Sequence, residues 1–111
     1  MATVSNLFVD QGSYFSRFLT LVTPAGNVFD LTDYTVSSQM RKSATSSTAY
    51  EIPCVIVDPA AGKIKLRLTA ASTENIPAGR YLYDLEVTDD SGEKLRVLEG
   101  IINIVPQITR V

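Results

Sequence analysis

The amino-acid sequence predicts an all-β protein whose strands form two antiparallel sheets packed face to face. Runs rich in β-branched and aromatic residues recur at intervals of roughly ten residues, the spacing of short strands in such folds. Turn-forming sequences separate them, as at Asp89-Asp90-Ser91-Gly92, a strong hairpin signal. In residues 63–68, cationic side chains alternate with aliphatic ones, so this strand has one wet face and one buried face. Such a sheet buries its apolar face against a second sheet, which predicts a sandwich.

Eight runs have strand character, and we expect seven to eight strands, joined mostly by hairpins. The runs are residues 3–9, 14–22, 28–31, 35–42, 50–57, 64–68, 80–88 and 93–105. The longer connection at residues 69–76 has helical composition, with Thr69 as a cap, and Pro77 limits it to about two turns. Because an isolated helix of that length is marginal, it should be docked as a crossover between the sheets. This combination is typical of an immunoglobulin-like β-sandwich with one short helical crossover.

The second run carries apolar groups on both faces. Phe18 and Val22 lie on one side, and Phe15, Leu19 and Leu21 lie on the other. A strand with one solvated side does not have this pattern. We therefore expect either a central strand or a strand whose outer face meets a partner, with Phe15 and Leu19 on that outer face.

Two later runs carry residues that interrupt regular pairing. Pro53 has no amide proton, so the run at residues 50–57 should lie at a sheet edge or contain a bulge. In the last run, the alternation changes phase between Val97 and Ile102, and Gly100 is a natural site for a bulge or bend. The neighbouring run alternates cleanly and should point its inward set at the core: Tyr81, Tyr83, Leu85 and Val87.

Length and composition predict one domain. With 111 residues, 45% of them apolar, the chain can build a single core over residues 1–111, flanked by short arms at residues 1–6 and 106–111. Its single cysteine, Cys54, excludes an intrachain disulfide. The first residues lack the features of a secretory signal, and no apolar run approaches the ~20 residues that span a bilayer. We expect synthesis in a cytoplasm and no membrane contact.

The residue types argue against catalysis. The chain has no histidine, the side chain used most often for proton transfer near neutral pH and for metal binding. Cys54 lies mid-strand between isoleucines, as a buried apolar side chain would. The acidic residues at 89–93 lack the alternating ligands of a calcium loop and are better explained as turn formers. A net charge of −2 without a basic stripe indicates no nucleic-acid partner. We expect no enzyme activity, metal or cofactor.

Several sequence elements together resemble a tailed-phage structural domain. The chain is similar to the N-terminal domain of upper baseplate proteins of long-tailed phages, and to small free-standing virion proteins of contractile-tailed cyanobacterial phages. The resemblance covers nearly the whole chain, and its most distinctive elements are Asp-Leu-Thr-x-Tyr and Pro-Ala-Gly-x-Tyr-x-Tyr-Asp. These elements are residues 30–34 and 77–84, accompanied by Val9-Asp10-Gln11-Gly12-Ser13-Tyr14-Phe15, Pro24-Ala25-Gly26, Asp58-Pro59-Ala60-Ala61-Gly62-Lys63-Ile64 and Asp89-Asp90-Ser91-Gly92.

The resemblance implies a virion component that docks fibres or neighbouring subunits at the baseplate, tail or capsid surface, and it supplies no catalytic residues. Because the sequence contains one such domain, we expect no receptor-directed extension like that of the upper baseplate proteins, and so no direct binding to the host. Other virion proteins are the expected partners, with a homo-oligomer, for instance a trimer, also expected. The two arms could add a strand to a neighbour's sheet. The candidate interaction residues are Phe15, Arg17, Leu19, Leu21, Tyr34, Tyr50, Ile108 and Val111.

The alternative function is a carbohydrate-binding or adhesin-type module, because sandwiches commonly carry sugar sites. Tyr34, Tyr50 and the Ser/Thr-rich loop at residues 43–48 would supply the site. The absence of tryptophan counts against this alternative. A host glycan is therefore a less favoured partner than another virion protein.

Overall fold

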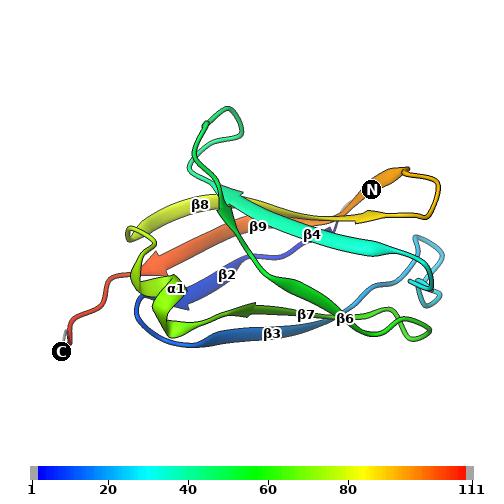
Figure 1. Cartoon of the computed structure of the whole chain (residues 1–111), viewed down its shortest axis with the longest axis horizontal. Helices are drawn as coiled ribbons and strands as arrows, with labels where there is room; N and C mark the ends of the chain where they lie inside the picture. The colour runs from blue at the N-terminus through cyan, green and yellow to red at the C-terminus, as the bar shows by residue number, and fades with distance from the viewer. Residues whose placement is uncertain (1–2, 110–111) are drawn as a thin grey trace.

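The computed structural model describes residues 3–109, which fold as two β-sheets packed face to face (Figure 1). The large sheet has the order β1-β9-β8-β4-β5, with β2 also paired to β9, and the small sheet has the order β3-β7-β6. The elements are β1 (Thr3–Val4), β2 (Leu7–Asp10), β3 (Phe15–Thr20), β4 (Thr35–Arg41), β5 (Tyr50–Glu51), β6 (Cys54–Asp58), β7 (Lys63–Leu68), α1 (Ala70–Glu74), β8 (Gly79–Thr88) and β9 (Lys94–Val105). The prediction of an all-β, immunoglobulin-like sandwich with one short helical crossover is confirmed.

Strand number and direction differ in detail from the expectation. Residues 3–9 and 50–57 are each divided in two, and residues 28–31 form only an isolated bridge from Val28 to Val22, so residues 3–109 contain nine strands. Both β1 and β2 pair with β9 in parallel, whereas every other pairing is antiparallel. The N-terminal segment therefore belongs to the chain's own large sheet from residue 3 onward, and it is not a free arm over that range.

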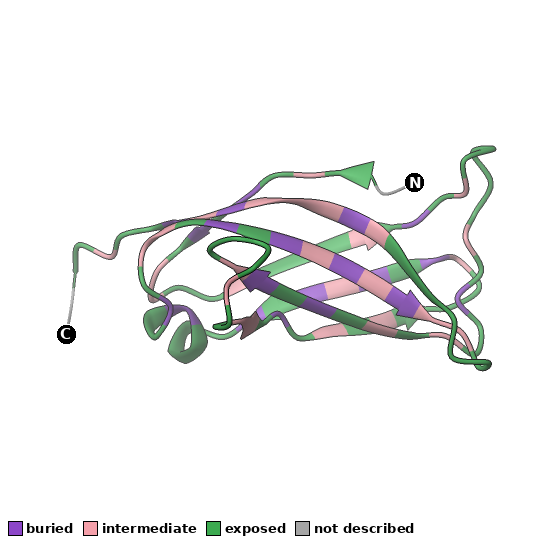
Figure 2. Ribbon diagram, turned by 90° about the horizontal axis from the view of Figure 1, so that it is seen from above, coloured by how far each residue is buried: buried purple, intermediate pink, exposed green. Residues whose placement is uncertain are grey.

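The core lies between the sheets and takes alternate residues from most of the strands, as the banding of buried and exposed positions shows (Figure 2). The large sheet contributes Tyr81, Tyr83, Leu85 and Val87 from β8, as predicted. The small sheet contributes Ile64, Leu66 and Leu68 from β7. The two buried tyrosines satisfy their hydroxyls on backbone oxygens: Tyr81 donates to Pro77 at 2.6 Å, and Tyr83 donates to Ser5 at 2.6 Å.

Pro53 marks the point where the chain passes from one sheet to the other. β5 belongs to the large sheet, and β6 is an edge strand of the small sheet. Between them, Ile52 is buried and donates its amide to Ser38, and the Pro53 carbonyl accepts from Arg67. The expectation that proline would place this run at an edge is confirmed. The crossing also closes one side of the sandwich.

The bulge in β9 is at Val97, not at Gly100. Leu85 pairs with Leu98 while Glu86 pairs with Arg96, so Val97 is the extra residue. Gly100 has a different role, because a side chain there would collide with the backbone oxygen of Ser5 on the segment joining β1 to β2. A close backbone approach, and not a bulge, explains this glycine.

The helix α1 carries the chain between β7 and β8, and so from the small sheet to the large one, as predicted. The Thr69 hydroxyl caps it by accepting the amide of Ser72 at 3.2 Å. Thr73, fully buried, docks the helix onto the β2–β3 turn, because its hydroxyl accepts from Gly12 and donates to Ser13. Within residues 3–109, no helix is long and apolar enough to cross a membrane.

Candidate functional site

The outer face of the small sheet exposes large apolar side chains on both of its edge strands. Phe18, on β3, is 64% exposed and pairs with Lys65 of β7, which in turn pairs with Val55 of β6, itself 55% exposed. Directly paired residues point to the same side of a sheet, so these three side chains form a row across all three strands. We call this surface the small-sheet face, and its members are Tyr14, Phe18, Val22, Val55, Val57, Lys63, Lys65 and Arg67.

Cations line the middle of the small-sheet face and contact its aromatic rings. Lys65 Nζ lies 5.4 Å from the centroid of the Phe18 ring, and Arg67 Cζ lies 5.9 Å from that of Tyr14. Such contacts hold the rings over the lysine and arginine stems. The face is therefore apolar at its two edge strands and positively charged along its central strand. A partner that covers it needs apolar groups together with carboxylates or other acceptors.

The orientation expected for β3 is wrong, because Phe15 and Leu19 face the interior. Both pack against the core, and Leu21 is buried within it. The strand is also an edge strand and not a central one, since β7 is its only sheet partner among the described strands. The exposed apolar residues are instead Tyr14, Phe18 and Val22, which occupy the alternate positions and point to the other side of the strand.

Arg17 explains why the sequence does not reveal which side of β3 faces the core. It pairs with fully buried Leu66, so it starts on the inward side of β3. Because β3 is an edge strand, the arginine is nevertheless exposed. From there its charge lowers the pKa of Tyr83, although burial of that phenol dominates and raises the pKa overall. A cation among inward-facing residues made that side resemble the solvated one.

The remaining predicted interaction residues lie apart from one another. Tyr34 is half-buried with its ring edge-on to Phe29 at 5.5 Å, whereas Tyr50 is half-buried edge-on to Tyr81 at 5.9 Å. The two tyrosines flank opposite ends of β4. Ile108 is 93% exposed beyond β9, and Val111 lies outside the described residues. Of the predicted residues that the structure describes, it brings together Phe15, Arg17 and Leu19 on the inward side of β3, with Leu21 next along the chain. Leu19 and Leu21 also line one wall of a groove.

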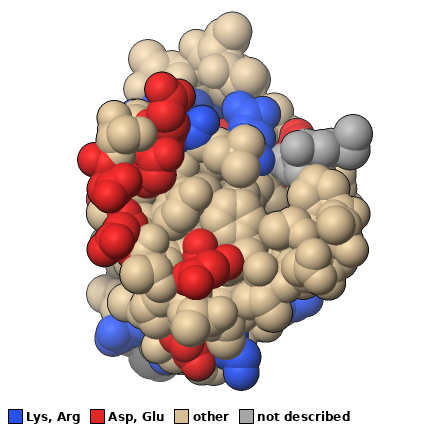
Figure 3. All heavy atoms as spheres, turned by 90° about the vertical axis from the view of Figure 1, so that its right-hand side faces the viewer, with Lys and Arg blue, Asp and Glu red and all other residues tan. Residues whose placement is uncertain are grey.

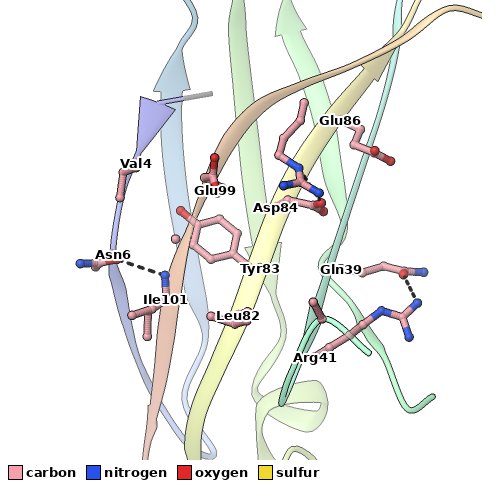
Figure 4. Close-up of a pocket in the computed structure, with 13 residues that line it drawn as sticks. Val4, Asn6, Gln39, Arg41, Leu82, Tyr83, Asp84, Glu86, Glu99 and Ile101 are labelled. Carbon is pink, nitrogen blue, oxygen red and sulfur yellow. Dashed lines mark hydrogen bonds and ion pairs between the residues drawn. The ribbon is translucent and has the colours of Figure 1, made fainter. Parts of the chain in front are cut away.

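The outer face of the large sheet has a hollow of about 540 Å³, lined by both polar and apolar side chains (Figure 4). Arg41 bonds the carbonyl of Ser46 and the side chain of Gln39, which ties the β4–β5 loop to the rim. On the other side Arg96 pairs with Asp84 at 3.1 Å. Tyr83 also borders the hollow, but only 4% of its surface is exposed. The hollow thus offers amide, guanidinium and carboxylate groups without an open aromatic platform.

Acidic side chains gather at the end of the sandwich where β8 turns into β9 (Figure 3). Asp89 accepts from Ser91 and Glu93, and Asp30 accepts from Thr32; these bonds hold the pKa of both carboxyls below the ordinary value. The hydrogen bonds stay within each turn, as expected for turn formers. Across residues 3–109, no three Cys, Asp or Glu side chains lie where they could jointly hold a metal ion.

Cys54 lies half-buried on β6 and packs against the core. Burial, with a smaller contribution from the negative charge of Glu51, raises the pKa of its thiol to about 11. A thiol held protonated at neutral pH is a poor nucleophile. The side chain acts as an apolar group of the sandwich.

Comparison with known proteins finds similarity of fold. No protein-family model and no curated protein matches the chain. Solved structures with a similar outline include an internalin-like protein of Listeria monocytogenes, at 12% identity over 96% of this chain and a TM-score of 0.45. A structure of VGSC beta subunits, studied for multimeric cell-adhesive interactions, has 11% identity over 92% of both chains and a TM-score of 0.49.

A family 123 glycoside hydrolase from Clostridium perfringens is similar at 10% identity over 97% of this chain, with a TM-score of 0.43. The chain spans 28% of the internalin-like protein and 24% of the hydrolase.

Proposed function

We propose that the chain is a structural protein of a phage particle that docks subunits or fibres through protein–protein contacts. The exposed apolar side chains on both edge strands of the small-sheet face carry this proposal, because clustered exposed apolar groups mark interaction sites on soluble proteins. The resemblance of residues 30–34 and 77–84 to upper baseplate domains supports the virion setting. Its partners are other virion proteins, and it acts without catalysis, metal or cofactor after synthesis in the host cytoplasm.

The small-sheet face is suited to a rigid, specific contact. Its apolar residues are fixed on paired strands, so a partner orders few groups when it covers them. Burying an exposed aromatic such as Phe18 contributes roughly 1.5–3 kcal/mol. The central cations Lys65 and Arg67 would set partner orientation and choice through charge complementarity. Docking thus takes its strength from β3 and β6 and its selectivity from β7.

Incorporation of variants into particles tests the proposal. Cells assembling the particle are supplied with tagged wild-type chain, with Phe18→Asp, or with the control Leu82→Asp, whose side chain is exposed on the other sheet. We expect wild-type and Leu82→Asp chains in purified particles and a loss of at least tenfold for Phe18→Asp. Particles that contain no wild-type chain, or that take up Phe18→Asp equally well, would refute the docking role of this face.

A carbohydrate-binding module is the second candidate, and the hollow on the outer face of the large sheet is the observation that favours it. Gln39, Arg41 and Asp84 present donors and acceptors around one concave surface, an arrangement that can bind hydroxyl groups. Glycan-array binding that is lost in Arg41→Ala but kept in Phe18→Asp would establish this function in place of the first. Absence of glycan binding leaves the docking function as proposed.

A further inference from the structure

One side of the sandwich is open, and an apolar groove enters the core there. The groove lies between β1 of the large sheet and β3 of the small sheet and has a volume of about 370 Å³. On the opposite side the chain crosses from β5 of the large sheet to β6 of the small sheet at Pro53. The apolar lining includes Leu19, Leu21, Phe29, Leu95, Val97 and Leu98. Three of these side chains, Leu19, Phe29 and Val97, pack against the core without being fully covered by it.

The backbone of β3 along this opening has unpaired hydrogen-bonding groups. The amide of Leu21 donates to Gly62 on the side of β7. Amide direction alternates along a strand, so Leu19 and Arg17 also point toward β7, whereas Ser16, Phe18 and Thr20 point away from it. No described strand of the small sheet lies on that outer side. The free edge of β3 therefore presents backbone amide and carbonyl groups beside an apolar groove. An additional strand could pair with these groups and place its side chains in the groove.

The segment after β9 has the features of such a strand. Ile108 is 93% exposed, and residues 106–109, as far as the structure describes this end, have no helical or strand structure of their own. Just before it, the backbone of Gln107 donates to the side chain of Gln11 at 3.0 Å, which fixes the base of this segment beside the end of β2. An isoleucine held almost wholly in water gains free energy from any apolar site that it can reach.

Ile108 cannot reach the groove of its own chain. The groove borders β9 at Leu95, Val97 and Leu98, whereas Ile108 follows Gln107 directly at the far end of that strand. From Leu98 to Val105 the strand rises about 3.3 Å per residue, or roughly 23 Å over seven residues. One residue beyond the anchored Gln107 adds less than about 4 Å. Only another molecule can place this isoleucine in the groove.

We propose that the segment following Gln107 of a second copy of this chain adds a strand to the free edge of β3 and inserts Ile108 into the open groove. Donor and acceptor are different surfaces, so the contact is heterologous and each molecule can give one strand while receiving another. Copies joined in this way close into a ring or continue as a filament. The site adjoins the small-sheet face, with which it shares Val22, but its groove lies on the inner side of β3 and it does not rest on the docking function proposed above.

Sedimentation velocity on two matched variants tests this contact. Ile108→Glu alters the donor and Leu95→Glu alters the acceptor, where the native leucine is 48% exposed and the variant can fold. Leu82→Glu, on the outer face of the large sheet and 43% exposed, is the control. We expect concentration-dependent association of the wild type and the control, and dissociation constants raised about tenfold or more in both variants, because each would bury a carboxylate.

Mixing the two variants gives the sharper result. Ile108→Glu keeps an intact groove and Leu95→Glu keeps an intact donor segment, so the mixture should form a one-to-one complex that grows no further. A wild type that stays monomeric at the highest attainable concentration, or a mixture that forms no complex, overturns the proposal. Phe18→Asp should associate like the wild type, so failure of the small-sheet docking function would remain distinguishable.

Discussion

Gly100 lies in the middle of β9, at the point where the segment between β1 and β2 passes over it. We predict that Gly100→Ala destabilises the fold by about 1–3 kcal/mol, because the added methyl group meets the Ser5 carbonyl and one of the two segments must move. Urea denaturation measures the loss. The amide of Ser5, which donates to Glu99 at 2.9 Å, should also exchange faster with solvent. An unchanged denaturation midpoint would show that the segment between β1 and β2 can move away from residue 100 at no cost in stability.

Cys54 should give the protein an alkaline instability. Burial raises the pKa of this thiol from 9.0 to about 11 in the folded state. The unfolded chain therefore releases the proton first, and the thiol's contribution to stability is complete below pH 9 and is lost as pH rises toward about 11. We predict that the wild type loses more of its free energy of unfolding over this range than Cys54→Ala does.

Denaturation of the two proteins in parallel at each pH isolates the Cys54 component. Burial also raises the pKa of Tyr81 and Tyr83, but both tyrosines are present in each protein, so their contribution cancels in the difference. A difference that stays constant with pH would mean that the folded thiol titrates as it does in the unfolded chain.

The orientation of single residues was the least predictable property from sequence. Ile64, Leu66 and Leu68 alternate with cations in a strand that has neighbours on both sides, and their burial follows from that pattern. Residues Phe15 to Leu21 have apolar groups on both faces, so the pattern alone allows either assignment. The position of β3 at the edge decides the matter, since it lets inward Arg17 reach water and leaves outward Phe18 uncovered.

At the scale of elements, α1 depends on one buried hydroxyl. Thr73 has no exposed surface, and its hydroxyl accepts the amide of Gly12 at 3.0 Å while donating to the carbonyl of Ser13 at 2.9 Å. We predict that Thr73→Val, which keeps the shape and removes the hydroxyl, destabilises the protein by about 1–3 kcal/mol because these backbone groups lose their partner. Chemical denaturation measures this loss. Thr73→Ser, which retains the hydroxyl, should be milder, and equal losses for both variants would assign the effect to packing.

The sequence predicted the ends of strands and of the helix well where the chemistry of a single residue determines them. Pro53 lacks an amide proton, and it stands where the strand leaves one sheet for the other. Thr69 caps the helical crossover as predicted, and the helix ends at Glu74, three residues before Pro77. The predicted position of the bulge in β9, at Gly100, is wrong, and the bulge is at Val97. Its position depends on how β8 and β9 pair and twist, and not only on the conformational freedom of a glycine. The parallel pairing of β1 and β2 likewise depends on a partner about a hundred residues away, which local patterns do not report.

At the scale of the whole molecule, both sheets share one core, so residues 3–109 should unfold as a unit. Leu66 of the small sheet and Leu85 of the large sheet belong to the same buried cluster, and neither sheet has another core. We predict a single transition in which calorimetric and van't Hoff enthalpies agree. Scanning calorimetry checks this, and two resolved transitions would show that the sheets melt separately.

The parallel pairing of β1 and β2 with β9 also determines how the chain should respond to tension. Force applied between the start of β1 and the end of β9 acts along these strands and shears them past one another. The hydrogen bonds between them must therefore break together and not one after another. Strands loaded in this way resist unfolding under force. If the module transmits load between two attachment points near its ends, it should yield only at high force, and then abruptly.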